Sequence, residues 1–319
     1  MKKKLENLTI IENDYQVVDW YVEPHQGYSS TFSNIRRFEG MSELPDYHDS
    51  GVYHMAGVPF EIRRIDPYRY EQKEPYIAFA KDYADKVCES LEAGNAFLAA
   101  GSYCTHIPSI LGGIRRAAGP ERKIGVIWMD AHADNYIIEE TAEEKLRLLG
   151  VPMSTFLGQT YPDWREEAGL VPPISGEDTL AGDLRYFDEE SDKNLRSAGV
   201  QTVDQKMFRQ AESWKKAVDD LAERVDVLFM HVDADILHHD YLPAYEYDVV
   251  NGNSLEIVKE NIRAVAQTGK LIGATVMCVG FENKPDRERD VNNINGIRLV
   301  STILSNWKQM PDICCEKEE

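Results

Sequence analysis

Apolar and polar positions along the chain fall into two alternating kinds of segment from residue 76 onward. In one kind, apolar residues recur three or four positions apart, which is the spacing of an amphipathic helix. These segments cover residues 76–91, 141–149, 206–223, 254–267 and 291–304. The other kind is a continuous apolar run of four to nine residues, and such runs cover residues 96–100, 124–129, 200–203, 225–232 and 271–279. Runs without two-residue alternation predict strands that are covered on both faces, as in a parallel sheet.

Alternation of strands and helices predicts an α/β fold with a central, mainly parallel sheet. Residues 1–74 are rich in Tyr, Asp, His and Pro and have weak periodicity, so we expect irregular structure that wraps the front of the fold. Residues 310–319 form a polar tail. No linker rich in Gly, Ser or Pro divides the chain, so the sequence predicts a single domain over residues 1–319.

The charge balance narrows the classes of partner. The chain of 319 residues carries 35 Lys and Arg against 55 Asp and Glu, a formal charge of −20. This balance argues against nucleic acid and against an anionic membrane surface, because both bind basic faces. Five cysteines without metal-type or disulfide-framework spacing indicate a reducing compartment. With no apolar stretch near 18 residues and no signal segment, we expect a cytoplasmic protein.

Acidic clusters follow two of the predicted strands. Asp130, His132 and Asp134 come directly after the run at 124–129, and Asp233 and Asp235 end the run at 225–232. Alternate side chains of an extended chain share a face, so each cluster can converge on one point. Ligands in open α/β sheets bind outside the carboxyl ends of the strands, which is where both clusters lie.

Four carboxylates at one point require a cation. At about 4 Å and an effective dielectric near 20, each like-charge pair costs about 4 kcal/mol. The carboxylates would become protonated or move apart unless divalent ions neutralise their charge. A lone Asp at a strand end more often caps a helix, but the two motifs together favour metal binding. Oxygen-rich ligation with one nitrogen favours Mn²⁺, Mg²⁺ or Fe²⁺ over structural zinc.

These motifs resemble those of the ureohydrolase family, which includes arginase, agmatinase and formimidoylglutamase. The segment WMDAHAD at residues 128–134 is similar to the family motif W-x-D-A-H-x-D, and HVDAD at 231–235 is similar to S-x-D-x-D. Residues 182–203 resemble the family's G-x-R strand and the turn after it, and Pro243 with the alanine that follows it stands where the family often has Pro-Ala. The resemblance spans residues 97–304.

The resemblance implies a three-layer α/β/α domain of the arginase type with Mn²⁺ at the strand ends. Asp130 and Asp233 would bridge two ions, and His132 and Asp235 would complete one of them. Asp134 would help to bind the other ion and would act as the catalytic partner of the hydroxide that the metals generate. The family commonly forms trimers or hexamers, so a homo-oligomer is expected.

The sequence departs from the family at the first metal ligand. Where the family has the His of G-G-D-H-S, the register places Tyr103, whose ordinary pKa near 10 makes it a poor Mn²⁺ ligand. His106 lies three residues later, with a packing role as its simpler interpretation. His231 replaces the motif serine. Two roles are open for this residue: a buried, hydrogen-bonded imidazole or an extra metal ligand. One ion or two are therefore expected, with other divalent metals as alternatives to Mn²⁺.

Two further departures concern the substrate. Leu149 stands at the position of the histidine that shuttles protons in arginase. Ungapped pairing puts Cys278 where a strand presents a substrate-binding Glu, and Glu282 has the same parity four residues later. A nucleophilic role for Cys278 is disfavoured, because a carboxylate-rich surrounding raises the pKa of a thiol.

The sequence thus predicts a metal-dependent hydrolase of C–N bonds in a linear guanidino or amidino compound. Agmatinase-like or formimidoylglutamase-like activity is expected in preference to that of arginase, with Cys278 and Glu282 as the candidate substrate-binding residues. The alternative is a catalytically degenerate member of the fold with a structural or regulatory role. Phosphoesterase chemistry is a weaker third interpretation, because no Gly-rich phosphate cradle is present.

Overall fold

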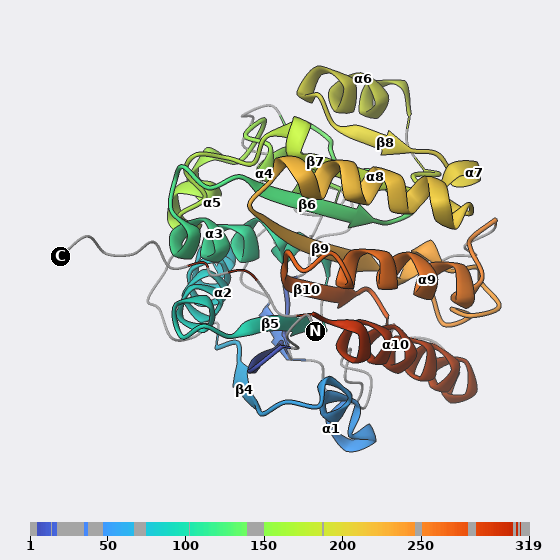
Figure 1. The fold of residues 1–319 in the computed structure, drawn as a ribbon. Helices are drawn as coiled ribbons and strands as arrows, with labels where there is room; N and C mark the ends of the chain where they lie inside the picture. Colours follow the sequence, from blue (N-terminus) through green and yellow to red (C-terminus); the bar gives the residue numbers. More distant parts are fainter. Residues whose placement is uncertain are drawn as a thin grey trace, which may run out of the picture.

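The computed structural model describes most of the chain (Figure 1). The described residues are 5–13, 15–17, 35–37, 47–66, 75–101, 103–138, 150–186, 188–245, 251–279, 285–308, 311 and 313. The predicted helix at residues 141–149 and the polar tail at 310–319, apart from residues 311 and 313, lie outside this set.

A central sheet joins strands from both ends of the chain. Its described strands run in the order β4-β1-β5-β10-β9-β6-β7-β8, and every pairing is parallel. Their bounds are β1 Leu8–Glu12, β4 Phe60–Arg64, β5 Ala96–Ala100, β6 Ile124–Met129, β7 Thr179–Gly182, β8 Gln201–Val203, β9 Val227–Asp233 and β10 Leu271–Met277. A separate antiparallel pair comprises β2 Tyr15–Val17 and β3 Ile35–Arg37.

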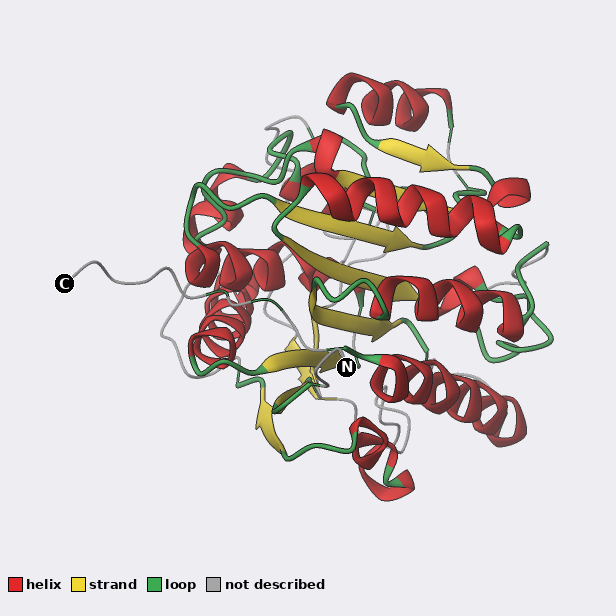
Figure 2. Cartoon of the chain, viewed as in Figure 1, coloured by secondary structure: helices red, strands yellow, loops and turns green. Residues whose placement is uncertain are grey.

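Helices flank this sheet in two groups (Figures 1 and 2). Helices α2, α3 and α5 pack on one another, and α9 packs on both α8 and α10. The helices are α1 Tyr47–Ser50, α2 Pro75–Glu92, α3 Ile107–Ala118, α4 Pro152–Phe156, α5 Pro162–Ala168, α6 Glu189–Ala198, α7 Gln205–Phe208, α8 Ala211–Arg224, α9 Leu255–Ala266 and α10 Asp286–Asn306. Short 3₁₀ turns lie between these elements, at η1 Val52–Ala56, η2 Cys104–His106, η4 Gly176–Asp178 and η5 Ala234–Ile236. The predicted three-layer α/β/α fold with a parallel sheet is confirmed.

The prediction of irregular structure for residues 1–74 is wrong for two segments. β1 lies inside the sheet between β4 and β5, and every residue of β1 is buried. The apolar run in β1 is only four residues long, and β4 is an edge strand that is partly exposed along its length. Strands this short give too weak a pattern to be separated from loops.

One predicted helix is interrupted. Residues 206–223 form α7 and α8, with the break at Arg209 and Gln210. The interruption brings Phe208 and Trp214 together edge to face, with ring centroids 4.8 Å apart. Both rings cover Gly182, where an added Cβ would lie 2.6 Å from the Trp214 ring. Glycine at this position therefore lets the two aromatic side chains pack directly on β7.

The four strands β5, β10, β9 and β6 are buried along their whole length and lie side by side. Gly273 in β10 pairs with Phe97 in β5, and an added Cβ there would lie 2.2 Å from the Phe97 ring. A fully buried Phe contributes about 3–5 kcal/mol relative to Ala. Because the strands are parallel and adjacent, the residues that follow them meet along one edge of the sheet.

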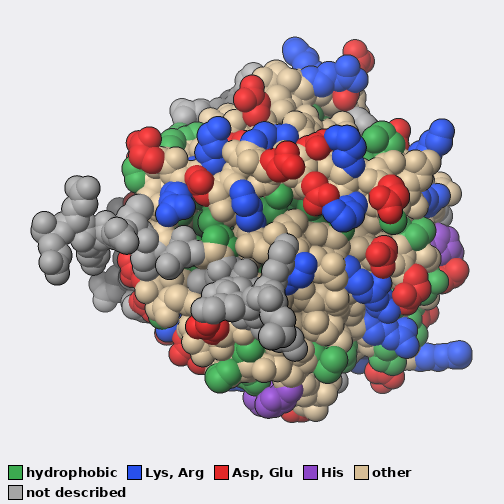
Figure 3. All heavy atoms as spheres, in the orientation of Figure 1, with side chains coloured by type: hydrophobic (Ala, Val, Ile, Leu, Met, Phe, Trp, Pro, Cys, Tyr) green, Lys and Arg blue, Asp and Glu red, His purple; other side chains and the backbone are tan. Residues whose placement is uncertain are grey.

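The helix faces turned away from the sheet are polar. On the face shown in Figure 3, acidic and basic side chains are interspersed. Lys215 pairs with Asp219 and Lys216 with Asp220 along α8, each four residues apart. Such pairs at exposed positions contribute only a few tenths of a kcal/mol each. Among the described residues, no helix is both long and apolar enough to cross a membrane.

Candidate metal centre

The two acidic clusters lie next to each other. Strands β6 and β9 pair in register up to Met129 and Val232, and Asp130 and Asp233 are the next residues of the two strands. Asp130 is 1% exposed and Asp233 is 3% exposed. The carboxyl ends of neighbouring parallel strands thus bring two buried carboxylates to one point, as the sequence predicts.

His132 joins two of the carboxylates at one end of the centre. Its Nδ1 lies 2.7 Å from Oδ2 of Asp235 and 3.6 Å from Oδ1 of Asp130. One ligand atom from each of these three residues falls within 4.8 Å of the others, a spacing that can hold a metal ion. Burial by itself lowers the pKa of His132, but the two carboxylates outweigh it and raise this pKa to about 11. Without a cation, the imidazolium acts as the counter-charge of the two acids.

Asp235 is held from several sides. The backbone N–H of Ala131 donates to its Oδ1 at 3.1 Å, and the hydroxyl of Tyr245 donates to its Oδ2 at 3.1 Å. Arg185 donates to the backbone carbonyl of Asp235 at 2.7 Å. Burial raises the pKa of Asp235, but the hydrogen bond and charge of His132 outweigh it, so that the net shift is downward. The carboxylate is therefore ionised and fixed in direction.

The middle of the centre holds two buried polar atoms without hydrogen-bond partners among the described residues. They are Oδ2 of Asp130 and Nε2 of His231, which lie 3.9 Å apart. The other ring nitrogen of His231, Nδ1, is 2.8 Å from the hydroxyl of Thr275. Asp130, His231 and Asp233 form a second group with ligand atoms within 4.8 Å. A buried polar atom without a partner costs about 1–3 kcal/mol, and a cation between these atoms would remove that cost.

The charge states of this middle group fit a divalent cation. Burial lowers the pKa of His231 to about 3, so the imidazole is neutral and can offer a lone pair. Burial, followed by the charge of Asp235, raises the pKa of Asp130 and of Asp233 well above the ordinary value. Neutral imidazole and carboxyl groups that lose their protons when a cation binds are the donor set that divalent ions take. The residues at these strand ends therefore fit a divalent metal.

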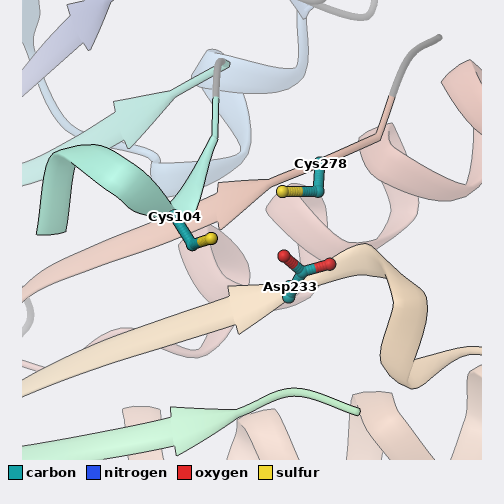
Figure 4. Close-up of side chains that lie close together, drawn as sticks. All are labelled: Cys104, Asp233 and Cys278. Atoms are coloured by element: carbon teal, nitrogen blue, oxygen red, sulfur yellow. The ribbon is translucent and has the colours of Figure 1, made fainter. Parts of the chain in front are cut away.

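The other end of the centre contains two thiols. Cys104, Cys278 and Asp233 bring their ligand atoms within 4.8 Å of one another, with both sulfurs above the carboxylate in Figure 4. The thiol of Cys104 also donates to Oδ2 of Asp134 at 3.0 Å. Asp134 has φ 47°, so the chain is left-handed there, and its hydrogen bond with Cys104 places one carboxylate oxygen beside this thiol. The candidate ligands thus divide between two ends, which the middle group joins by sharing Asp130 with the His132 end and Asp233 with the thiol end.

Neither Tyr103 nor His106 is part of these groups. Tyr103 is half-buried and packs against the hydrophobic core. His106 is 2% exposed and lies between Phe79 and Tyr83, with ring centroids 5.2 and 5.0 Å away. Burial lowers the pKa of His106 to about 3. The packing interpretation of His106 is therefore the one that the structure supports.

Cys104 is the site residue that the sequence prediction missed. It immediately follows Tyr103, the residue that the sequence register places at the family's first ligand position. Its presence beside a strand end, in a chain with a second cysteine at the end of β10, is the signal that could have identified it. Cys278 directly follows β10 and lies at this centre, whereas Glu282 and Leu149 lie outside the described residues.

Comparison with known proteins agrees with the fold and the motifs. Arginase of Bacillus caldovelox is 27% identical over 158 residues, which make up 46% of this chain and 52% of that arginase. The matched part thus spans about half the length of this curated relative.

Solved structures of the same fold are more distant in sequence. Arginase from Bacillus subtilis superposes with a TM-score of 0.74 at 19% identity, and the alignment covers 94% of this chain and 98% of that one. Formimidoylglutamase from Bacillus subtilis superposes with a TM-score of 0.64 at 15% identity, covering 95% and 88%. At these identities the likeness establishes the fold alone.

The family assignment rests on a longer match. The sequence model described as the arginase family matches residues 30–304, which include every described residue of the candidate centre. With this match over most of its length, the chain belongs to the arginase family.

Proposed function

We propose that the protein is a metal-dependent hydrolase that cleaves a C–N bond in a linear guanidino or amidino compound. The observation that carries the proposal is the buried centre at the ends of β6 and β9, where Asp130, Asp233 and Asp235 meet His132. Burying this many acids costs stability unless a cation neutralises them. Family membership and the hydrolase names of its relatives support the same interpretation.

The ligands divide into roles by position. Asp130 and Asp233 would hold ions between the two central strands, because each belongs to two of the ligand groups. His132 and Asp235 would complete one position. Bound divalent ions supply Lewis acidity, lowering the pKa of water and orienting it toward a trigonal carbon. Mn²⁺ suits the oxygen ligands of this end, and other divalent metals are compatible with it.

Asp134 is our candidate for proton transfer. Its Oδ2 already accepts a hydrogen bond from the thiol of Cys104, so this oxygen faces the interior of the centre. A carboxylate in that place can hold the attacking water by accepting its proton. It can then return the proton to the nitrogen of the C–N bond that breaks, which leaves as ammonia or an amine, while the attacked carbon becomes the carbonyl carbon of urea, formamide or a related amide.

The group that is attacked is a guanidinium or an amidine. A centre built from carboxylates attracts the positive charge of either group. We expect agmatinase-like or formimidoylglutamase-like activity because Leu149 stands in place of the proton-shuttle histidine of arginase. Cys278 and Glu282 remain the predicted substrate-binding residues, and a cytoplasmic homo-oligomer, as a trimer or hexamer, remains the predicted form.

The experiment is a product assay with matched variants. Protein loaded with Mn²⁺, Zn²⁺ or Fe²⁺ is incubated with agmatine, arginine and formimidoylglutamate, and the release of urea, ammonia and formamide is measured. Asp235→Asn should lower the rate by more than about a hundredfold, since it removes a ligand. Asp240→Asn, at an exposed carboxylate in the following loop, should leave the rate unchanged. Equal rates for wild type and Asp235→Asn under every metal would refute the proposal and favour the structural alternative.

A further inference from the structure

We propose that Cys104, Cys278 and Asp233 form a thiolate-containing position for one ion of this centre, which selects Zn²⁺ over Mn²⁺. The inference rests on the proposed function, because it assigns one of the two ion positions of the same centre. It differs in substance from the oxygen-rich site for Mn²⁺ or another divalent metal that the sequence predicts.

The first support is geometric. The three residues follow or end β5, β10 and β9, which are neighbours in the sheet, so paired strands hold the three ligands in place. Their ligand atoms already lie within 4.8 Å of one another. A tetrahedral zinc ion with Zn–S distances near 2.3 Å needs its sulfurs about 3.8 Å apart. Small side-chain rotations would therefore close the site.

The second support is the surrounding of the thiols. Cys104 and Cys278 are 6% and 5% exposed, yet both sulfurs face a carboxylate, whereas a structural cysteine usually packs among apolar groups. The thiol of Cys104 donates to Oδ2 of Asp134 at 3.0 Å. Metal binding replaces that proton, and each sulfur that becomes a ligand releases one proton to solvent.

The third support lies on the other side of Asp233. The atoms Oδ2 of Asp130 and Nε2 of His231 are buried without hydrogen-bond partners among the described residues, and they share a ligand group with Asp233. A carboxylate between two such groups can give one oxygen to each neighbouring ion. The position at the thiols and the position at Asp130 are then two halves of one centre.

The ligand types differ between the two halves. Thiolates are soft donors that favour Zn²⁺, whereas carboxylates and water suit Mn²⁺. The half with Asp130, His132 and Asp235 accepts either ion, because oxygen and imidazole ligands are less selective. The half with Cys104 and Cys278 should reject Mn²⁺ in the presence of Zn²⁺. The protein would then bind Zn²⁺ alone, or Zn²⁺ and Mn²⁺ together.

The test uses Co²⁺ as a spectroscopic probe of the full-length protein, kept reduced. Co²⁺ bound by thiolates gives a strong near-ultraviolet charge-transfer band, which oxygen and nitrogen ligands do not give. Wild type should show the band, one equivalent of Zn²⁺ should abolish it, and excess Mn²⁺ should leave it. Cys104→Ser and Cys278→Ser should each weaken the band and reduce Zn²⁺ affinity by more than about tenfold. Cys88→Ser, at a buried cysteine in α2, is the matched control and should behave as wild type.

The outcomes separate this inference from the proposed function. Absence of the band in wild type, its persistence in the Cys104→Ser/Cys278→Ser double variant, or its loss on adding Mn²⁺ would each overturn the thiolate position. Should the variants fail to fold, X-ray absorption of Zn²⁺-loaded wild type must still show sulfur at about 2.3 Å. A band without any hydrolysis would uphold the thiolate position and refute the hydrolase. Hydrolysis without a band would uphold the hydrolase and refute the thiolate position.

Discussion

Replacing His106 by Phe tests whether this histidine belongs to the core or to the metal centre. The imidazole lies between the rings of Phe79 and Tyr83 and is 2% exposed. Burial lowers its pKa from 6.5 to about 3. In the unfolded chain the group takes up a proton below pH 6.5, whereas in the folded protein it stays neutral down to about pH 3.

The sign and size of the effect follow from this difference. Between pH 6.5 and 3 the unfolded state binds more protons, so the free energy of unfolding falls as the pH falls. At a cost of 1.36 kcal/mol per pH unit, lowering the pH from 7 to 5 should cost the wild type about 2 kcal/mol at this residue. Phe keeps the aromatic stacking and carries no proton. The stability of His106→Phe relative to wild type should therefore improve by about 2 kcal/mol over that interval.

Urea unfolding at pH 7 and at pH 5 measures the difference directly, since all other titrating groups are common to both proteins. His48→Phe, at an exposed position, controls for the loss of one imidazole. Bound metal should be the same in His106→Phe and wild type. A stability difference that does not change between pH 7 and pH 5, or a loss of bound metal in the variant, would refute the buried, non-ligand assignment.

Three further changes test the centre and its support. Metal at 100 times its dissociation constant should raise the free energy of unfolding by about 2.7 kcal/mol, and a chelator should reverse this gain in calorimetry; an unchanged transition would contradict a folded-state metal site. Arg185→Met should destabilise by about 3–5 kcal/mol in urea unfolding, because it leaves its buried ion-pair partner Asp183 uncompensated. The Arg185→Met/Asp183→Asn double variant should recover part of this loss, and no recovery would contradict the pairing. Gly252→Ala should destabilise by about 1–3 kcal/mol, since the new Cβ would lie 2.3 Å from the Leu237 carbonyl carbon; wild-type stability would contradict this close approach.

The strands that carry the centre could be predicted because burial and periodicity agree there. β5, β6, β9 and β10 are continuous apolar runs in the sequence and are buried at every residue. The helices α2, α9 and α10 each have an apolar stripe, and their bounds fall within a few residues of the predicted ones, α10 beginning five residues earlier. Local pattern and tertiary packing favour the same conformation in these elements.

Helix α3 was missed because its sequence contradicts its conformation. It begins with Ile107 and Pro108 and contains Gly112 and Gly113, a pair that disfavours a helix interior. Packing explains both glycines: an added Cβ at Gly112 would lie 2.4 Å from the Ala168 carbonyl oxygen, and one at Gly113 would lie 2.5 Å from a carbonyl oxygen of α2. Close approach of α2 and α5 requires these glycines, and no single-sequence pattern carries that information.

The candidate site likewise contains residues that could be placed from the sequence and residues that could not. Asp130 and Asp233 could be placed from strand parity alone, because the strands continue up to them. The parity argument fails at Asp134, because it assumes an extended chain and φ there is 47°. Cys104 lies one residue beyond the expected ligand position, in a 3₁₀ turn that the sequence pattern does not signal. Residues beyond a strand end depend on turns, which short-range patterns specify poorly.

The ligands of the centre lie on strands whose order in space differs from their order along the chain. Cys104 and Cys278 are 174 positions apart, and they meet only after β5 and β10 have paired. An unfolded chain offers no ready-made cage, because these side chains are brought together only by the assembled sheet. The candidate cage is accordingly a product of tertiary structure, and it would be lost as soon as the strands separate.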